Sequence, residues 1–401
     1  MKLNFKVAND NGNSEQALIV DGNLYRQPNT YAMPEKTSFE DNSEPELLVP
    51  NLLNELAVDI QSDSIAFGGL FFIGRKAIKS KYTAHTMSVD SEKKYESDLP
   101  IINTLGNLSG IAVKRAFEKS GKLPKEISLQ VDMATALPVN QWSRKTAGEF
   151  AERFMNGLHT AIVYVGHKKV RVSIAFTFVK VIPEGTPVLF TLIEDQDGNY
   201  RNDDIFDEFN KEYDKKVDGE YFQNKRIKHV DIGDGTSDTP LTIGYEYDRD
   251  FVNGIPTGIG HSINKAIDLF NSQVSDINPS RQQLIDYVKD KEHKYHNDAV
   301  RLIKQSMRSE VKAIYDHIVD EVKKASYEVN VICVYGGGSI LMKEQLYPLL
   351  KKLCDKPELQ AELLWIPEKY APLMNVEGLN IFLNTVFPQL KEKELAANNK
   401  A

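Results

Sequence analysis

The chain has 401 residues, of which 41% are apolar and 26% charged; this composition is typical of a globular protein and excludes a disordered or collagen-like chain. Its length predicts two or three domains. The 57 acidic residues outnumber the 49 basic residues and give a net charge of −8, which disfavours direct binding of nucleic acid, because phosphates require lysine and arginine. We therefore expect another protein to hold any DNA on which this chain acts.

The cysteines and the N-terminus point to a reducing compartment. Cys333 and Cys354 are the two cysteines of the chain, and their spacing fits neither a disulfide framework, nor a CxxC redox site, nor a zinc cluster. We expect both to be small apolar residues of the core. No run approaches the roughly 18 apolar residues of a membrane span, and Met1–Asp10 lacks the features of a secretory signal. The sequence therefore predicts a cytoplasmic protein without membrane contact.

The start of the chain predicts short strands joined by tight turns. Residues 2–8 alternate apolar and polar side chains, which indicates a strand, and the Asn- and Gly-rich cluster at 9–14 indicates a turn. A second strand at 16–20 leads into an Asp-Gly hairpin turn. Residues 35–99 are mixed and polar, and we expect them to form a small, less regular subdomain.

A helix and three strands follow, at residues 101–119, 127–133, 161–165 and 170–181. We expect the helix to stop at Gly121, residues 134–142 to form a loop, and the last two strands to pair in antiparallel orientation. Residues 194–226 are strongly charged and contain few branched aliphatic side chains. They predict a surface insertion that is partly helical at 205–213, and they are the best candidate for a domain boundary.

The second half of the chain repeats the opening pattern. A strand at 227–231, a glycine-rich turn at 232–238 and a strand at 241–245 predict a second domain whose beginning is related to that of the first and which faces the same ligand. The remaining expected elements are a helix from Gly258, a helix at 300–322, a strand at 329–335, a helix at 379–387 and a frayed tail at 391–401.

The first turn, Asp10-Asn11-Gly12-Asn13-Ser14, has the composition of a phosphate-binding turn. Successive backbone N–H groups in such a turn can point at one phosphate, and a glycine lets the backbone approach closely. Asp10 would repel a phosphate, so we expect it to hold a hydrated Mg²⁺ through water. The alternative is an ordinary hairpin turn without a ligand.

The second turn follows Asp231, and its candidate phosphate-binding residues are Gly233, Asp234, Gly235, Thr236 and Ser237. Two more glycine clusters precede helices and leave room for a flat ring or an anion: Gly258 with Gly260, and Gly336, Gly337 and Gly338 with Ser339. The triple-glycine segment lacks the spacing of a dinucleotide fingerprint, and the chain has no P-loop motif. For these segments too, plain turns without a ligand are the alternative.

No Ser/His/Asp or Cys/His set of a nucleophilic enzyme stands out in the sequence. Gln141, in the loop after a predicted strand, is a candidate for orienting a water molecule, and the alternative is an ordinary exposed glutamine. His261 is expected to be a polar residue at a helix start, and His293 and His296 do not form a pattern of metal ligands.

The order of these segments resembles the actin-like ATPase superfamily, whose phosphate turns, connecting helices, glycine turn and terminal helix can be laid along residues 1–390 without rearrangement. Within the superfamily, the sequence is most similar to bacterial plasmid-segregation actin-like proteins of the ParM type. Four segments carry this likeness: Leu137–Gln141, Val181–Gly185, Gly258–Ala266 and Met374–Gly378.

The resemblance implies an α/β protein with the two-domain actin/ribonuclease-H-like ATPase fold and a nucleotide cleft between the domains. It places domain I at 1–193, with the small subdomain inside it, and a charged boundary at 194–226. Domain II is expected at 227–375, and a terminal helix at 376–390 is expected to return to domain I.

The resemblance also implies a function. Proteins of this kind bind ATP (or GTP) and Mg²⁺, polymerise head to tail into filaments and hydrolyse the nucleotide slowly. Their filaments separate plasmid copies through an adaptor protein bound to centromeric DNA, so the contact with DNA would be indirect. Two alternatives keep the fold and change the function: a small-molecule kinase of the sugar or acetate type, and a non-plasmid cytoskeletal or division scaffold.

The site roles follow from the same resemblance. Gln141 would orient the attacking water and Asp231 would assist as an acceptor, while Mg²⁺ would lie near Asp10 and Asp231. Adenine would lie near Gly336–Gly338. One departure from the family pattern is Asp234, since many relatives have a small residue there and a carboxylate near phosphates weakens their binding unless it faces Mg²⁺ or solvent.

Overall fold

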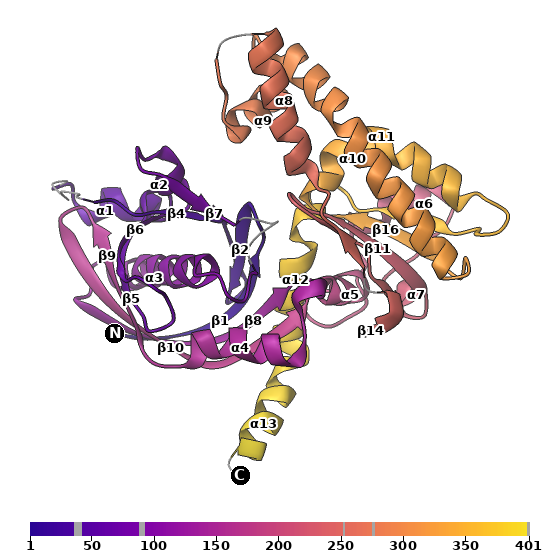
Figure 1. The fold of residues 1–401 in the computed structure, drawn as a ribbon. Helices are drawn as coiled ribbons and strands as arrows, with labels where there is room; N and C mark the ends of the chain where they lie inside the picture. Colours follow the sequence, from indigo (N-terminus) through magenta and orange to yellow (C-terminus); the bar gives the residue numbers. More distant parts are fainter. Residues whose placement is uncertain (36–41, 88–92, 252, 275–276, 399–401) are drawn as a thin grey trace. The chain divides into compact units, whose positions relative to one another are not determined.

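The computed structural model describes residues 1–35, 42–87, 93–251, 253–274 and 277–398 of the chain. The chain forms two compact units (Figure 1). Unit 1 comprises Met1–Phe190, Gln196–Gly198 and Asn375–Ala401, and unit 2 comprises Thr191–Asp195 and Asn199–Met374.

Unit 1 is built on a single sheet of ten strands. In spatial order these are β3 (Asn23–Pro28), β2 (Glu15–Val20), β1 (Lys2–Asn11), β8 (Glu126–Leu137), β10 (Lys168–Pro183), β9 (His159–Val165), β5 (Ala57–Gln61), β6 (Gly69–Ile73), β4 (Thr30–Ala32) and β7 (Ala84–Thr86). The central strands β1, β8 and β10 are parallel, with Asn9 opposite Thr135 and Leu137 opposite Pro183. Their carboxyl ends therefore meet at one edge of the sheet, which is where the candidate residues of this unit lie.

The sheet of unit 1 curls around the helix α3 (Leu99–Ser120), and α4 (Arg144–Met155) packs on its outer face against β10 (Figure 1). The predicted stop of α3 is confirmed, since Gly121 has φ +67° and its N–H donates to the carbonyl of Phe117. The other helices are α1 (Pro45–Leu48), η1 (Val49–Glu55), α2 (Arg75–Lys79), η2 (Val139–Gln141), α12 (Met374–Thr385) and α13 (Phe387–Asn398), while α5 (Thr186–Ile193) leads into unit 2.

Unit 2 contains a sheet of seven strands. The order β14 (Glu246–Tyr247), β13 (Leu241–Ile243), β11 (Arg226–Ile232), β12 (Ser237–Asp238), β15 (Gly254–Ile255) is completed by β16 (Val331–Tyr335), parallel to β11, and β17 (Glu362–Trp365), parallel to β16. The helices are η3 (Asp204–Phe206), α6 (Asp207–Glu212), α7 (Glu220–Gln223), η4 (Arg249–Phe251), α8 (Ile259–Gln273), α9 (Arg281–Lys289), α10 (His296–Lys324), α11 (Gly337–Cys354) and η5 (Ala371–Leu373).

Several expectations about regular structure are confirmed. The amphipathic helix expected at 300–322 is α10, whose buried stripe includes Ile303 and Ile314, and β9 and β10 pair in antiparallel orientation. Both cysteines are free and buried. In the part of the chain that the structure describes, no helix combines the length and the apolar character that crossing a membrane requires.

The structure corrects three expectations about the strands of unit 1. Asn9, Asp10 and Asn11 belong to strand β1 rather than to a turn, because Asp10 pairs with Ala17 and Asn11 with Gln16. Strand β8 likewise continues to Leu137 and shortens the expected loop. The stretch expected to be less regular contributes β5, β6 and β7 to the main sheet.

The charged stretch 194–226 is partly helical, as expected at 205–213, where η3 and α6 lie. It forms η3, α6 and α7, and Phe206, Phe209 and Phe222 are buried in their own aromatic cluster, in which the rings of Phe206 and Phe222 stack 5.0 Å apart. The expected frayed tail is helical through Asn398 in α13, and Lys391 anchors it by donating to Asp132 at 2.6 Å.

Candidate functional site

The first candidate turn lies at the carboxyl end of β1 in unit 1. Only Gly12, Asn13 and Ser14 lie outside the strands, and a β-carbon at Gly12 would come within 2.8 Å of the carbonyl oxygen of Glu15. Asn29 holds the turn from the side, since its side chain donates to the Gly12 carbonyl at 2.7 Å and its backbone N–H donates to the Ser14 carbonyl at 2.9 Å. Glycine is therefore required here by the close approach of the backbone.

A buried layer of uncharged polar side chains supports this turn. The Gln16 amide donates to Asn9 at 2.9 Å and to the Thr104 hydroxyl at 2.9 Å, and the Asn107 amide donates to Gln16 at 2.8 Å. Asn11, two residues after Asn9 on β1, is 1% exposed, and its carboxamide makes no hydrogen bond within the described part of the chain. Since buried polar groups are normally hydrogen-bonded, this carboxamide is a candidate for contact with a ligand.

Charged residues gather around Asp10 and Gln141 at the same edge. The ammonium of Lys94 donates to Glu184 at 2.6 Å, and the backbone N–H of Lys94 donates to the Gln141 side-chain oxygen at 2.8 Å. Desolvation by the surrounding protein raises the pKa of Asp10 to about 6, and the nearby Lys94 ammonium opposes this shift while Glu184 adds to it. Lys94 and Glu184 were not among the residues that the sequence predicted.

The second candidate turn, in unit 2, is closed by a hydrogen bond from the Gly233 N–H to the Thr236 carbonyl at 2.9 Å. The N-terminus of α8 packs directly against it, because the Gly260 N–H donates to the Asp234 carbonyl at 2.7 Å. A β-carbon at Gly258 would lie 2.4 Å from the same carbonyl oxygen. The structure therefore brings these two predicted segments together.

The triple-glycine segment reaches the same place from the end of β16. Gly336 has φ +87°, and a β-carbon there would lie 2.4 Å from the Asp231 carboxylate and 2.5 Å from the Ile232 carbonyl. Gly338 packs on Ile232, whereas a β-carbon at Gly337 would meet no atom within 4 Å. Within unit 2, Asp231, the second turn and the N-termini of α8 and α11 thus form one group, in which the first two N–H groups of α8 donate to carbonyls of the turn.

The hydroxyl groups of this group are engaged with the backbone. The Ser339 hydroxyl donates to the Gly336 carbonyl at 2.8 Å, and the Ser237 hydroxyl donates to the Thr257 carbonyl at 2.6 Å. Thr236 contacts Asp238. These hydroxyls therefore stabilise the turns.

The unusual carboxylate of Asp234 is compensated. Arg281, from the first turn of α9, donates to it at 2.9 Å, and its oxygen atoms lie against Gly260 at the positive end of α8. Its charge is therefore balanced within unit 2.

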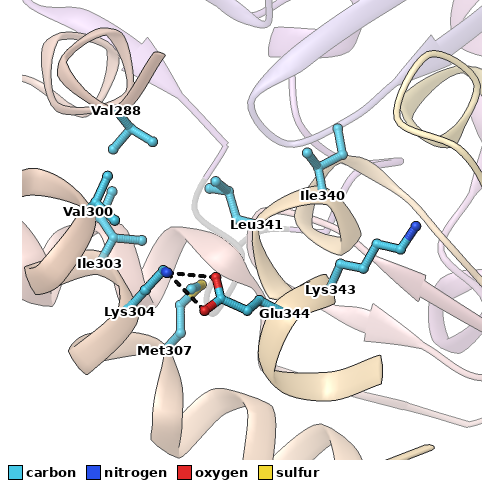
Figure 2. Close-up of a pocket in the computed structure, with 9 residues that line it drawn as sticks. All are labelled: Val288, Val300, Ile303, Lys304, Met307, Ile340, Leu341, Lys343 and Glu344. Atoms are coloured by element: carbon cyan, nitrogen blue, oxygen red, sulfur yellow. Dashed lines mark hydrogen bonds and ion pairs between the residues drawn. The ribbon is translucent and has the colours of Figure 1, made fainter. Parts of the chain in front are cut away.

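A groove of about 440 Å³ lies among α9, α10 and α11 (Figure 2). Its lining comes from α9, α10 and α11, namely Val288, Val300, Ile303, Lys304, Met307, Ile340, Leu341, Lys343 and Glu344. Most of these side chains are apolar, and Lys304 forms an ion pair with Glu344 at 2.6 Å. Because Ile340 comes two residues after Gly338, the groove starts where the glycine segment ends.

A magnesium ion fits single carboxylates at these positions. Within the described residues, no group of three or more His, Cys, Asp or Glu side chains converges as a metal cage. Mg²⁺ is usually bound through one or two carboxylates, several waters and substrate phosphates, so Asp10 in unit 1 and Asp231 in unit 2 have suitable chemistry.

Comparison with known proteins decides the fold. Residues 8–186 match the family model described as the N-terminal domain of actin-like proteins. The crystal structure of the actin-like protein Alp7A superposes on 98% of this chain and 100% of its own, with a TM-score of 0.71 and 16% sequence identity. The chain has the actin-like fold. The resemblance seen in the sequence and the predicted fold class are both confirmed.

Other structures agree with this actin-like assignment. ParM of Bacillus thuringiensis, solved with ATP, matches with a TM-score of 0.59 and 14% identity over 96% of this chain and 99% of its own. Ta0583, an archaeal actin homolog, matches with a TM-score of 0.60 and 14% identity over 95% and 99%. No curated protein matches the chain by sequence.

Proposed function

We propose that this actin-like chain is an ATPase that assembles head to tail into filaments with ATP and Mg²⁺ and moves plasmid DNA through an adaptor protein. The observation that carries the proposal is the group of glycine-dependent close contacts in unit 2, which brings the second turn and the N-termini of α8 and α11 together. Structures of Bacillus thuringiensis ParM with ATP, AMPPNP and ADP support a nucleotide as the ligand.

The phosphates would be held by the two turns, Gly12–Ser14 and Gly233–Ser237. Mg²⁺, held through water near Asp10 and Asp231, would supply the positive charge that phosphoryl transfer needs. Gln141 would orient the attacking water, with Asp231 as an assisting acceptor; a neutral carboxamide positions the water rather than removing its proton. Gln141 accepts a hydrogen bond from the backbone of Lys94, and the ammonium of Lys94 is near enough to Asp10 to act on its pKa. This shared neighbour supports the role of Gln141.

The base would lie against Gly336–Gly338 and extend toward the groove of α9, α10 and α11. This groove offers apolar side chains for a flat ring at Ile340 and Leu341 and polar groups at Lys304 and Glu344. The same pocket chemistry is compatible with adenine or guanine, so GTP is included in the test below.

Assembly and DNA attachment rest on the family resemblance. A head-to-tail contact is heterologous and does not close, so it produces open filaments. The net charge of −8 favours attachment to DNA through an adaptor in the cytoplasm rather than direct binding.

The decisive experiment measures light scattering and phosphate release after Mg-ATP is added to the pure protein. We expect both to rise without any added small molecule and to be absent with EDTA. Asp231→Ala should abolish or greatly slow phosphate release, whereas Asp320→Ala, an exposed carboxylate on α10, should leave it unchanged. A clean monomer at tens of micromolar protein, across salt concentrations and with either ATP or GTP, would refute the filament. Phosphate transfer only in the presence of a sugar or acetate would instead indicate a kinase.

A further inference from the structure

A short turn at residues 93–98 of unit 1 lies at the edge of the sheet where β8 and β10 end, beside Gln141 and Glu184. Its Lys94 side chain is only 4% exposed, and its ammonium lies 2.6 Å from Glu184, which directly follows β10. The backbone N–H of the same residue donates to the Gln141 side chain at 2.8 Å, at the end of η2. Glu184 is itself fixed, because its N–H donates to the carbonyl of Leu137 at the end of β8 at 2.8 Å.

The far side of this turn is clamped by α4. Arg153 donates to the carbonyl oxygens of Tyr95 at 3.1 Å and Ser97 at 2.7 Å, and it forms an ion pair with Asp98. Such multiple contacts from one guanidinium define both position and orientation. The backbone at Lys94 therefore has little freedom to move while its ammonium remains paired.

The contact with Lys94 determines which way the Gln141 carboxamide faces. A backbone N–H can only donate, so the atom that receives it must be the side-chain oxygen of Gln141. The amide NH₂ of Gln141 and the second lone pair of its oxygen then remain available to a water molecule. Without the contact, the carboxamide could rotate and present either end to that water.

We infer that Lys94 is a positioning residue for hydrolysis: its ammonium, paired with Glu184, holds the backbone N–H that fixes the Gln141 carboxamide. The inference rests on the proposed function, because it assigns Lys94 a part in the same hydrolytic site. Lys94 acts through Gln141, so its loss changes the rate of hydrolysis more than the affinity for nucleotide.

The variant Lys94→Met removes the charge and keeps most of the side-chain volume. We expect kcat for ATP hydrolysis to fall about 100-fold, the loss that a misplacement of about 1 Å typically causes, while the Kd for the non-hydrolysable analogue AMPPNP changes less than about threefold. Glu184→Gln keeps an acceptor for the ammonium but not the charge and should give an intermediate loss. The matched control is Lys93→Met, since the neighbouring Lys93 is 58% exposed and contacts Glu96 and Tyr95 at the surface.

A double-variant cycle separates positioning from simple destabilisation. If Lys94 works through Gln141, then Lys94→Met in a Gln141→Ala background costs no further activity. Filament mass is measured by sedimentation of the same samples, and melting temperatures show whether each variant is folded. If Lys94→Met is unfolded, Glu184→Gln takes its place in the cycle.

The outcomes distinguish this inference from the proposed function. A wild-type chain that releases no phosphate refutes both. A wild-type chain that hydrolyses ATP refutes the inference alone if folded Lys94→Met keeps its rate, if it loses AMPPNP affinity as strongly as rate, or if its effect adds in full to that of Gln141→Ala.

Discussion

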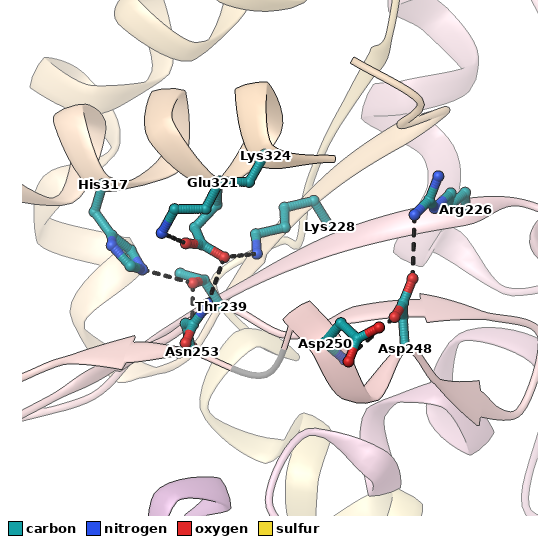
Figure 3. A network of polar contacts seen from close by, with 9 residues as sticks. All are labelled: Arg226, Lys228, Thr239, Asp248, Asp250, Asn253, His317, Glu321 and Lys324. Atoms are coloured by element: carbon teal, nitrogen blue, oxygen red, sulfur yellow. Dashed lines mark hydrogen bonds and ion pairs between the residues drawn. The ribbon is translucent and has the colours of Figure 1, made fainter. Parts of the chain in front are cut away.

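A buried ion pair in unit 2 yields an asymmetric prediction (Figure 3). Lys228 on β11 and Glu321 on α10 are 1% and 0% exposed, with their charged atoms 3.3 Å apart. Glu321 also accepts hydrogen bonds from Asn253 at 2.8 Å and from Lys324 at 2.8 Å. Lys228, by contrast, has Glu321 as its one ion-pair partner among the described residues. Removing the acid should therefore cost more stability than removing the base.

The magnitudes follow from what each substitution leaves behind. Glu321→Leu leaves a buried ammonium without a counter-charge, for which a loss of about 3–5 kcal/mol of unfolding free energy is expected. Lys228→Met leaves the carboxylate with two donors, so we expect a loss of about 1–2 kcal/mol. The double variant should come within about 1 kcal/mol of the wild type, because the freed Asn253 and Lys324 are exposed and can be hydrated.

The pH dependence provides an independent check. Burial lowers the pKa of Lys228 to about 8, and the attraction of Glu321 only partly opposes the shift. Loss of Glu321 should lower this pKa further. Because the unfolded chain then binds the proton more tightly than the folded chain, the stability of Glu321→Leu rises with pH, by at most about 1.4 kcal/mol per pH unit.

The assay is urea unfolding followed by tryptophan fluorescence. Trp365 lies in unit 2 and Trp142 in unit 1, so a Trp142→Phe background makes the signal specific for unit 2. Equal losses for Glu321→Leu and Lys228→Met, or a destabilisation of Glu321→Leu that does not shrink between pH 7 and pH 9.5, would refute the reasoning.

Two further predictions concern the second turn. Gly336→Ala should lower the free energy of unfolding by about 2–4 kcal/mol and weaken ATP binding, because its β-carbon would sit on a left-handed backbone and overlap Asp231. Gly337→Ala, whose β-carbon would lie in open space, is the control. Equal melting temperatures for the two variants would contradict the argument. Arg281→Ala should weaken ATP binding about fivefold, or roughly 1 kcal/mol, because it leaves the charge of Asp234 unpaired. Adding Asp234→Asn to the same chain should restore the affinity, and isothermal titration calorimetry measures both changes. A failure of this rescue would show that the ion pair does not act through charge.

The sequence predicted the glycine-dependent parts of the site because their requirement is local. A glycine before a helix or inside a tight turn can be recognised without knowledge of the fold. At Gly258, Gly260 and Gly336 the backbone does pass too close to another segment for a β-carbon. Asp10 was predicted from the same local composition, as part of the first turn. Its place inside β1 was missed, because the pairing with Ala17 depends on the partner strand rather than on the turn-like composition around it.

Residues that act through distant partners could not be predicted in this way. Lys94 and Glu184 are 90 positions apart and meet only because the turn before α3 lies against the end of β10. A weaker signal was present in α3, where Thr104 and Asn107 interrupt an apolar helix at helical spacing and mark the buried polar layer. In the charged stretch 194–226, the abundance of acidic and basic residues concealed a small aromatic core.

The two turns are supported by different chemistry, and this difference suggests how they divide the work. Under the first turn the side chains of Asn9, Gln16 and Thr104 are uncharged, so they do not neutralise Asp10. Burial therefore raises the pKa of Asp10, and the Lys94 ammonium opposes this rise only in part. A carboxylate in such surroundings gains strongly from a divalent cation, because attraction grows as the local dielectric falls. The second turn instead has its extra carboxylate balanced by Arg281 and packs against the N-terminus of α8. Under the proposed function, the partly compensated carboxylate of Asp10 in unit 1 would therefore favour Mg²⁺, and the turn and helix N-termini of unit 2 would favour the phosphates.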